Sequence, residues 1–341
     1  MRILLIESCE KKIKKDFSNT SIVHARNSVI LQRILQCDLI SHESEIERVI
    51  DNKYDIIICM YASPYMKYDK YLKILDVNQP ARLYWLVNDH DCEDNILLRK
   101  AVIKYNKSYG VICNNPREGY RHWILGKKLN NKKLNDWIDE WITINLNCLI
   151  FNELERTATT TLFRGGKSDC IYFGTFRKHR VSDMLLYNYC DYAISTSSKN
   201  IKKFKEAGID ARYTDRLSWE IGKETLTNFK YSIYFEDTHT HKNYAFMANR
   251  FYECVMCGVL MFFDTRCGLV IKNSEYHIDP FLICKDGAEL QNKINHLDND
   301  DALYRLLLKS QNDSIPIIER HQREVINILN EKIQNRFEYS A

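Results

Sequence analysis

Two charged residues stand three positions apart in an otherwise apolar helical segment. Arg250 and Glu253 lie within residues 246–257, which end at Gly258 and lead directly into an apolar strand. Residues three apart are neighbours on a helix face, so the two could form a plain ion pair. A guanidinium can also pair with phosphate oxygens, and a carboxylate can accept hydrogen bonds from a ribose diol. The apolar helix and the buried strand behind it favour a nucleotide site.

A second polar group follows a predicted strand at residues 170–173. The strand ends at Gly174, and Thr175, Arg177 and Arg180 follow as the chain turns into a helix. Backbone N–H groups at such a turn, together with guanidinium groups, can bind a diphosphate. An ordinary turn with solvated basic residues would have the same sequence, so this motif alone does not decide between the two interpretations.

The elements around these residues have the pattern of α/β structure. In the first half, strands are predicted at residues 2–6, 54–60, 83–87, 109–113 and 147–151, with helices at 28–37 and 94–105. After a polar stretch at 152–169, strands are predicted at 170–173, 192–194, 231–235, 259–263 and 281–284, with helices at 181–189, 200–207, 246–257 and 301–335, the last interrupted at Pro316. Nearly continuous apolar strands that alternate with helices predict parallel sheets covered on both faces.

The restart of this pattern predicts two domains. We expect a Rossmann-like domain at residues 1–155 and a second Rossmann-like domain, which carries the candidate nucleotide site, at 168–317, with a final helix at about 318–341 that packs back on the first domain. Open parallel sheets bind ligands at the carboxyl ends of their strands. A cleft between the two domains is therefore the expected active site.

The composition is that of a globular protein without a membrane segment. Of the 341 residues, 45% are hydrophobic and 28% charged, and the net charge of +4 permits a polyanionic partner without indicating one. No run of eighteen apolar residues and no signal peptide is present, which predicts a cytoplasmic protein with reduced thiols. The one CxxC, Cys254–Cys257, has no second pair to complete a zinc site and is expected in the core.

The two motifs together resemble the carboxyl-terminal domain of GT-B glycosyltransferases, and specifically of bacteriophage DNA β-glucosyltransferases. In that family a Gly-Ser-Phe-Arg turn opens the second domain and a helix with Arg-x-x-Glu follows. Gly174-Thr175-Phe176-Arg177 and Arg250-Phe251-Tyr252-Glu253 stand in these places, whereas Arg180 matches one position off. The resemblance implies two Rossmann-like domains that face each other across a central cleft. It also implies a UDP-sugar co-substrate, with Arg177, Arg180 and Arg250 at the diphosphate and Glu253 at the ribose.

The same resemblance singles out Asp89, in Asn88-Asp89-His90-Asp91 after the strand 83–87. The family has a Thr-Asp pair at this strand end, and its aspartate is the catalytic base. Such a carboxylate could take the proton of an acceptor hydroxyl during an inverting transfer. Two alternatives stay open: a helix-capping or loop aspartate, and a D-x-D metal element of GT-A enzymes formed by Asp89 and Asp91. The restarted α/β pattern favours GT-B, which requires no cofactor and allows a divalent metal without implying it.

The loop at residues 61–71 interleaves tyrosines with lysines. In the phage family the loop in this region enters DNA near a flipped-out nucleotide. The resemblance therefore implies that tyrosines fill the gap and lysines contact phosphates. The candidate DNA-binding residues are Tyr61, Tyr65, Lys67, Tyr68 and Lys70. A tyrosine-rich loop that packs on its own domain is the alternative.

The resemblance implies a specific reaction. We expect transfer of a hexose, glucose from UDP-glucose, to hydroxymethylated pyrimidines in double-stranded DNA, with inversion and Asp89 as general base. A GT-B enzyme with a glycan or small-molecule acceptor, and a non-catalytic nucleotide- or DNA-binding module, are the alternatives. A glutamate near the family's first loop has no clear counterpart among residues 17–27, which leaves the sugar open. We expect a monomer that makes no membrane contact, located in the host cytoplasm if a phage encodes it.

Overall fold

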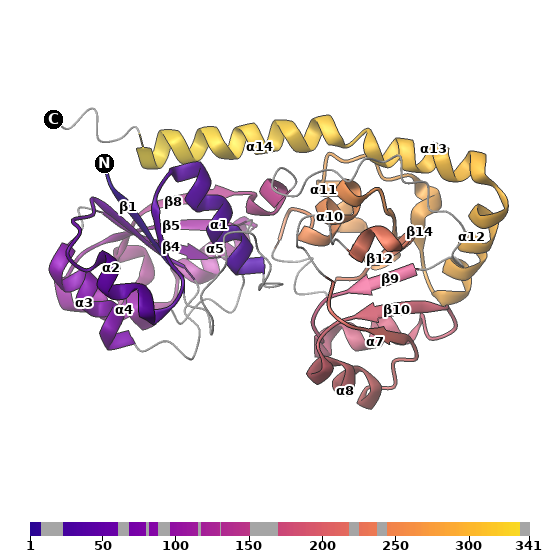
Figure 1. Cartoon of the computed structure of the whole chain (residues 1–341), viewed down its shortest axis with the longest axis horizontal. Coiled ribbons are helices and arrows are strands. Elements are labelled where there is room, and N and C mark those ends of the chain that lie inside the picture. The colour runs from indigo at the N-terminus through magenta and orange to yellow at the C-terminus, as the bar shows by residue number, and fades with distance from the viewer. Residues whose placement is uncertain are drawn as a thin grey trace. The chain divides into compact units, whose positions relative to one another are not determined.

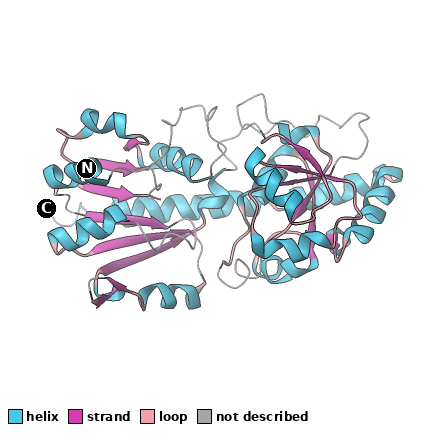
Figure 2. Ribbon diagram, turned by 90° about the horizontal axis from the view of Figure 1, so that it is seen from below, coloured by secondary structure: helices cyan, strands magenta, loops and turns pink. Residues whose placement is uncertain are grey.

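The computed structural model describes most of the chain. The described residues are 1–7, 23–60, 68–79, 82–87, 96–114, 117–129, 131–150, 170–217, 225–236 and 244–334. The chain divides into two compact units, Met1–Leu149 with His321–Ala341, and Ile150–Arg320 (Figure 1). Each unit is an α/β structure with helices around a six-stranded parallel sheet (Figure 2).

The sheet of the first unit has the strand order β2-β1-β3-β4-β5-β8, with every neighbouring pair parallel. Its strands are β1 Ile3–Ile6, β2 Asp38–Ile40, β3 Ile56–Cys59, β4 Arg82–Val87, β5 Tyr109–Asn114 and β8 Ile138–Ile144. Every residue of β1, β3 and β5 is buried, as expected for strands covered on both faces. The edge strand β8 mixes buried and exposed residues.

Helices and a short hairpin complete the first unit. They are α1 Val23–Leu35, α2 Ile46–Val49, α3 Tyr68–Asn78, α4 Ile96–Tyr105, α5 Glu118–Leu125 and the antiparallel pair β6 Lys128–Leu129 and β7 Lys132–Lys133. The core lies between these helices and the sheet, with the apolar side chains of β1, β3 and β4 against those of α2, α3 and α4.

The helix α14 (Ile315–Leu329) starts in the second unit and continues into the first. Pro316 stands in its first turn, where a missing N–H costs no helical hydrogen bond. From His321 onward the helix belongs to the first unit, where Gln322 Nε2 donates to the Cys148 carbonyl over 2.7 Å. The amino-terminal unit is thus completed by the last described part of the chain.

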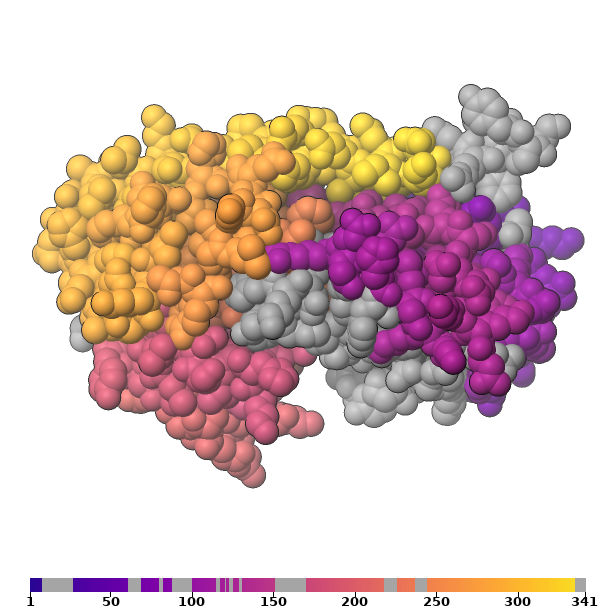
Figure 3. Space-filling model, turned by 180° about the vertical axis from the view of Figure 1, so that it is seen from behind, coloured from indigo at the N-terminus to yellow at the C-terminus, as the bar shows by residue number. Residues whose placement is uncertain are grey.

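The sheet of the second unit has the order β11-β10-β9-β12-β13-β14, again fully parallel. Its strands are β9 Cys170–Phe173, β10 Tyr192–Ser195, β11 Arg212–Thr214, β12 Tyr231–Tyr234, β13 Leu260–Asp264 and β14 Ile283–Cys284. Its helices are α7 Val181–Leu185, α8 Ser198–Glu206, α10 Asn249–Cys257, α11 Gly268–Asn273, α12 Gly287–Asn299 and α13 Asp301–Asn312. Orange and yellow residues of its carboxyl-terminal part form one continuous surface in Figure 3.

The helix α10 is enclosed by the second unit. All nine of its residues are buried, and it ends at Gly258, whose φ of 67° is a left-handed conformation that glycine adopts without strain. The following strand β13 is also buried along its whole length. A helix in this position can hold polar side chains against the end of the sheet.

Three predicted elements differ from the structure. The strand predicted at 281–284 is reduced to β14, because Pro280–Leu282 form a 3-10 helix. The strand predicted at 147–151 is wrong: residues Leu146–Leu149 form a 3-10 helix, and the strand of this region is β8. The helix predicted at 181–189 ends at Leu185. There the Gly287 N–H bonds to the Leu186 carbonyl, and a Cβ on Gly287 would lie 2.8 Å from Tyr187 Cα. This close backbone contact with the start of α12 replaces further helical turns.

Within the described ranges, no helix combines the length and apolar character needed to cross a membrane.

Candidate functional site

The candidate site lies where the strand order of the second sheet reverses. The first strand of the unit, β9, is flanked by β10 on one side and β12 on the other. Ligands of open α/β sheets bind outside the carboxyl ends of the strands at such a switch point. Gly174 follows β9 directly, and Glu236 stands two residues after β12. The backbone thus brings two segments that are distant in sequence to one place.

Three buried charged residues form an ion-paired group here. Arg180 donates from Nη2 to Glu236 Oε2, and Arg250 donates from Nη1 to Glu236 Oε1 over 2.9 Å. Arg180 and Arg250 are 8% and 9% exposed and Glu236 4%. Buried charges are tolerated when they are paired and hydrogen-bonded. Two cations share one carboxylate, so this Arg180–Glu236–Arg250 group keeps a net charge of one positive unit.

The Arg250 guanidinium is held by aromatic rings as well as by the carboxylate. Its Nη1 also donates to the Phe235 carbonyl, and its Cζ lies 5.1 Å from the ring centroid of Tyr172 and 5.3 Å from that of Tyr234. Burial acts to lower the pKa of Arg250, but the Glu236 carboxylate and Tyr172 hold this pKa above its ordinary value. The group therefore keeps its charge although it is buried.

The other edge of this guanidinium faces the Gly174 turn. A Cβ built on Gly174 would lie 3.3 Å from Arg250 Nη2 and 3.1 Å from Tyr172 Oη. The N–H of Gly174 itself donates to the Ser195 carbonyl over 3.3 Å. Among the described residues Arg250 Nη2 has no hydrogen-bond partner, since the recorded bonds of this side chain all leave from Nη1. The hydrogen-bond donor Nη2 of Arg250 is thus directed at the Gly174 turn.

The remaining predicted donor-site residues take different positions. Thr175 is exposed, and Arg177 is half-buried just before the 3-10 turn Lys178–Arg180. Arg177 shares no contact with Glu236 or Arg250 in the described part of the chain. The structure therefore brings together Gly174, Arg180 and Arg250, and leaves Arg177 outside their ion-paired group.

Glu253 does not pair with Arg250. The two residues lie three apart on α10, but the carboxylate that Arg250 contacts is that of Glu236. Glu253 is 2% exposed. A plain ion pair between positions 250 and 253 is therefore not the arrangement in this helix, and the Glu253 carboxylate is a separate buried polar group on α10.

Glu236 is the central member of the group, and it was not predicted from the sequence. The available signal was its position, since it is the first acidic residue after the apolar run 231–235. A polar residue at the carboxyl end of a central strand lies where ligands bind. The same argument, applied to every strand end, would have found it.

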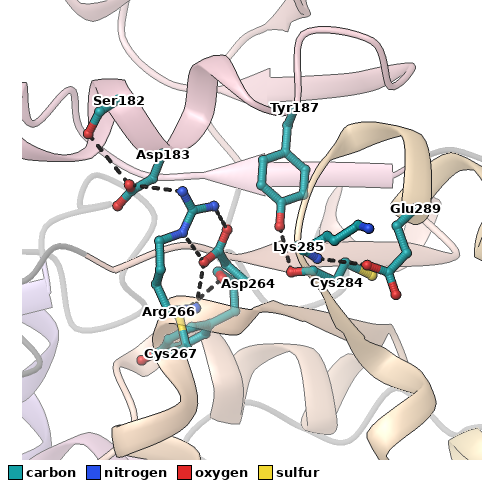
Figure 4. A network of polar contacts seen from close by, with 10 residues as sticks. Ser182, Asp183, Tyr187, Asp264, Arg266, Cys267, Cys284, Lys285 and Glu289 are labelled. Atoms are coloured by element: carbon teal, nitrogen blue, oxygen red, sulfur yellow. Dashed lines mark hydrogen bonds and ion pairs between the residues drawn. The ribbon is translucent and has the colours of Figure 1, made fainter.

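A second polar network supports the site from the neighbouring strand end (Figure 4). Arg266 pairs with Asp264, the last residue of β13, and donates to Asp183 Oδ1 on α7 over 3.0 Å. Hydrogen bonding to Asp264 raises the pKa of Arg266 above its ordinary value. In the same view the Tyr187 hydroxyl donates to the Cys284 carbonyl over 2.8 Å. These bonds fix α7, and with it the turn that carries Arg180.

The first unit has its own switch point, between β1 and β3. Glu7 follows β1 and is 1% exposed, and Ser28 of α1 lies beside it with Oγ 3.1 Å from Glu7 Oε2. Ser28 Oγ also lies 3.0 Å from the Met60 sulfur, at the end of β3. A buried polar group therefore marks the carboxyl edge of this sheet, one strand away from the end of β4.

Most candidate acceptor residues fall outside the described part of the chain. Asp89 and Asp91, two and four residues beyond the end of β4, lie outside it, as do Tyr61, Tyr65 and Lys67. The backbone of Tyr68 starts α3, but its side chain is not described. Lys70 is exposed on the same helix, and its Nζ lies 3.5 Å from Glu43 Oε2. A surface pair of this kind contributes little to stability.

The described residues hold no group of three or more histidine, cysteine or acidic side chains suited to a metal ion. Cys254 and Cys257 are both buried on α10. Burial raises the pKa of the Cys254 thiol well above its ordinary value, so this thiol stays protonated. The CxxC is thus part of the core.

Sequence comparisons identify no relative. No protein-family model matches the chain, and no curated protein matches it either.

Comparison with solved structures does find similar folds. The β-glucosyltransferase of T4 phage, in complex with UDP and Mn²⁺, superposes with a TM-score of 0.72 at 16% identity, over 98% of this chain and 100% of that one. An α-glucosyltransferase in complex with UDP-glucose and DNA containing an abasic site gives 0.64 at 12%, over 96% and 99%. The Anabaena protein HepE in complex with UDP-glucose gives 0.52 at 11%, over 97% and 100%. The chain has the two-domain GT-B fold, with two Rossmann-like sheets, as predicted.

Proposed function

We propose that this chain is a glycosyltransferase that moves glucose from UDP-glucose onto hydroxymethylated pyrimidines in double-stranded DNA, with inversion. Its fold is that of the T4 phage β-glucosyltransferase, described as a DNA-modifying enzyme and crystallised with UDP-glucose. The α-glucosyltransferase with the same fold was crystallised with UDP-glucose and DNA. These structural similarities support glycosyl transfer as the reaction class. The residues of the second unit support a nucleotide-sugar as its donor.

The Arg180–Glu236–Arg250 group is the observation that carries the proposal. It lies at the switch point, has a net positive charge, and leaves Arg250 Nη2 directed at the Gly174 turn. A diphosphate supplies several anionic oxygens, and arginine binds such oxygens with strong charge-assisted hydrogen bonds. The group is thus suited to the diphosphate of a nucleotide-sugar.

Glu253 and Arg177 have proposed roles beside this group. The buried Glu253 carboxylate lies on the same helix as Arg250, within reach of a nucleotide held by that residue, and we assign it to the ribose hydroxyls. Arg177, at the entrance to the 3-10 turn, would contact the outer side of the diphosphate. Thr175 offers its backbone N–H and hydroxyl next to Gly174.

The proposed chemistry is a single displacement. Asp89 takes the proton of the acceptor hydroxymethyl group. At the same time the oxygen of that hydroxymethyl group attacks C1 of the glucose from the face opposite the diphosphate. The bond from C1 to the diphosphate oxygen breaks, and the electron pair leaves with UDP. Arg180 and Arg250 stabilise the negative charge that develops on this leaving group. The arginines supply the positive charge in this step, although one T4 phage structure contains Mn²⁺ beside UDP.

The proposed contacts with the DNA acceptor involve the residues that the resemblance to phage DNA glucosyltransferases singles out. We propose that Tyr61, Tyr65 and Tyr68 occupy the space left by a flipped-out nucleotide, and that Lys67 and Lys70 contact phosphates. Lys70 is exposed in the first turn of α3, so a phosphate could replace Glu43 as its partner.

A transfer assay with defined acceptors tests the proposal. The protein is incubated with duplex DNA that contains hydroxymethylcytosine, hydroxymethyluracil or cytosine. Each DNA is combined with UDP-glucose, UDP-galactose or UDP-N-acetylglucosamine. The masses of the nucleosides are then measured by mass spectrometry. The expected result is one added hexose on a hydroxymethylated nucleoside and none on cytosine. Asp89→Asn should abolish transfer and leave UDP affinity within about twofold of that of the unchanged protein, because it removes the base and leaves the donor site intact.

Other outcomes would point elsewhere. If the protein bound UDP-glucose but added no hexose to any nucleoside, the assigned acceptor would change from DNA to a glycan or a small molecule. A chain that binds neither UDP nor UDP-glucose would refute the glycosyltransferase assignment and leave a non-catalytic module. Full transfer activity in Asp89→Asn would refute the assignment of the base.

A further inference from the structure

The first residue of α10 has a polar side chain without a partner. Asn249 is 7% exposed, and its Nδ2 is buried without a hydrogen bond to any described residue. A buried amide N–H that lacks a partner destabilises the fold, because it has lost its hydrogen bonds to water without replacement. Such groups are rare in folded proteins and call for an explanation. Bulk water does not reach this nitrogen, so solvent does not supply its missing hydrogen bond.

The backbone at this helix start also offers unused donors. The preceding residue is Ala248, which provides no side-chain cap. The first N–H groups of a helix have no intrahelical acceptor, and this end of the helix carries partial positive charge. In the described part of the chain, the backbone N–H groups of Asn249 and Arg250 have no hydrogen-bond partner. The start of α10 therefore presents several donors together and no cap.

A contact to β12 places this helix start beside the ion-paired group. The Ala248 N–H donates to the hydroxyl of Tyr234 over 2.9 Å, and the ring of Tyr234 lies against the Arg250 guanidinium. The unpartnered backbone N–H of Asn249 thus belongs to the same helix start as Arg250, whose Nη2 is also unpartnered among the described residues. A ligand that satisfies all of them needs several oxygen acceptors, and a negative charge would match the surroundings.

We propose that the side chain of Asn249 is a specificity-determining contact that donates from Nδ2 to a non-bridging oxygen of the donor diphosphate. The inference deepens the proposed function and rests on it, because the ligand is the diphosphate of the nucleotide-sugar. It assigns to the site a neutral donor in addition to the arginines. A neutral amide adds a hydrogen bond to the anion without adding to the charge that the protein must bury.

Two substitutions at this position separate a ligand contact from a structural role. Asn249→Ala removes the donor and should weaken UDP binding roughly 10- to 100-fold, the range for a hydrogen bond to a charged oxygen. Asn249→Asp places a carboxylate at a helix start, which favours the helix, but this carboxylate repels a diphosphate. We expect Asn249→Asp to bind UDP more weakly than Asn249→Ala and to melt at an equal or higher temperature.

The measurements are calorimetric titrations with UDP and UDP-glucose, and thermal melting of each variant without ligand. Asn292→Asp, an exposed position on α12, makes the same charge change on the surface and should leave UDP affinity unchanged. A stable Asn249→Asp variant with much reduced UDP affinity supports the inference, because a purely structural residue would not separate affinity from stability in this direction.

Three results would overturn the inference or its basis. UDP affinities of both Asn249 variants equal to that of the unchanged protein would refute the contact. A loss confined to UDP-glucose, with UDP unaffected, would place the amide at the sugar and refute the diphosphate assignment. A failure of the proposed function looks different, because in that case the unchanged protein binds neither UDP nor UDP-glucose.

Discussion

Arg250 donates from Nη1 to Glu236, 2.9 Å away, and the same carboxylate also accepts from Arg180. One buried acid therefore holds two guanidinium groups in place. Glu253 lies on the same helix as Arg250 but does not hold it. The acid that fixes the position of Arg250 is Glu236, which follows the end of β12. This relationship makes Glu236 the residue on which the geometry of the site depends.

Replacement of Glu236 by Gln should destabilise the protein and increase its response to UDP. The change leaves two buried cations without their shared anion, and breaking a buried ion pair costs about 3–5 kcal/mol. A bound diphosphate would partly replace the missing charge, so UDP should raise the melting temperature more in Glu236→Gln than in the unchanged protein. Differential scanning fluorimetry with and without UDP measures both effects.

A control for this variant is available in the same unit. Glu275 is an exposed acid that pairs with Arg320, and Glu275→Gln should change the melting temperature little, since exposed pairs contribute at most about 1 kcal/mol. If Glu236→Gln melted like Glu275→Gln, the shared carboxylate would have no role in holding the two arginines.

Gly174→Ala should weaken UDP binding with little effect on folding. The added Cβ would lie 3.3 Å from Arg250 Nη2 and 3.1 Å from Tyr172 Oη, so it would displace the guanidinium edge or occupy the space of the ligand. We expect a rise in the dissociation constant of UDP of about tenfold, or roughly 1.4 kcal/mol. Gly268→Ala is the matched control, because no atom lies within 4 Å of its added Cβ. Equal UDP affinity in the two variants would contradict the position of the donor site.

Transfer should persist after removal of divalent metal ions. The arginines supply the positive charge at the leaving group in the proposed step, so this step requires no metal ion. The initial rate is measured with UDP-glucose and hydroxymethylated DNA after extensive EDTA treatment, with and without added Mn²⁺. An initial rate that EDTA leaves unchanged would agree with this proposal, whereas complete loss with EDTA and full recovery with Mn²⁺ would favour the Asp89 and Asp91 metal element.

Stability should fall as the pH rises above about 9. Burial raises the thiol pKa from an ordinary value of 9.0 to about 12 at Cys59, Cys148, Cys190 and Cys284. In this range the unfolded chain loses these protons while the folded chain keeps them, so the free energy of unfolding decreases with increasing pH. Urea denaturation at pH 8 and pH 10 in reducing buffer measures the change. A stability that is equal or higher at pH 10 would contradict the burial of these thiols.

Much of the fold is readable from the sequence because the central strands are continuous apolar runs. Residues of β3, β5 and β13 are buried on both faces, so their side chains carry no alternation that could be mistaken for another element. The edge strand β8 was missed for the opposite reason. It carries Asp139 and Glu140, and Glu140 pairs with Arg82 of β4 over 3.0 Å, a contact that local sequence does not reveal.

The candidate site was only partly predictable. Arg250 stood out as a charged residue in an apolar helix, and Gly174 as the glycine at a strand end. Pairing across the sheet decides the rest, since Glu236 lies 56 positions from Arg180 and 14 from Arg250. The roles of Asp89 and of the tyrosine- and lysine-rich loop stay predictions that the transfer assay tests.

The division of α14 between the two units has a consequence for how the protein is made. During synthesis the first 149 residues leave the ribosome long before His321–Ala341, which belong to the same compact unit. Gln322, whose Nε2 donates to the Cys148 carbonyl, is added 174 residues after Cys148. A nascent chain that stops near residue 320 would therefore contain all of the second unit but only part of the first.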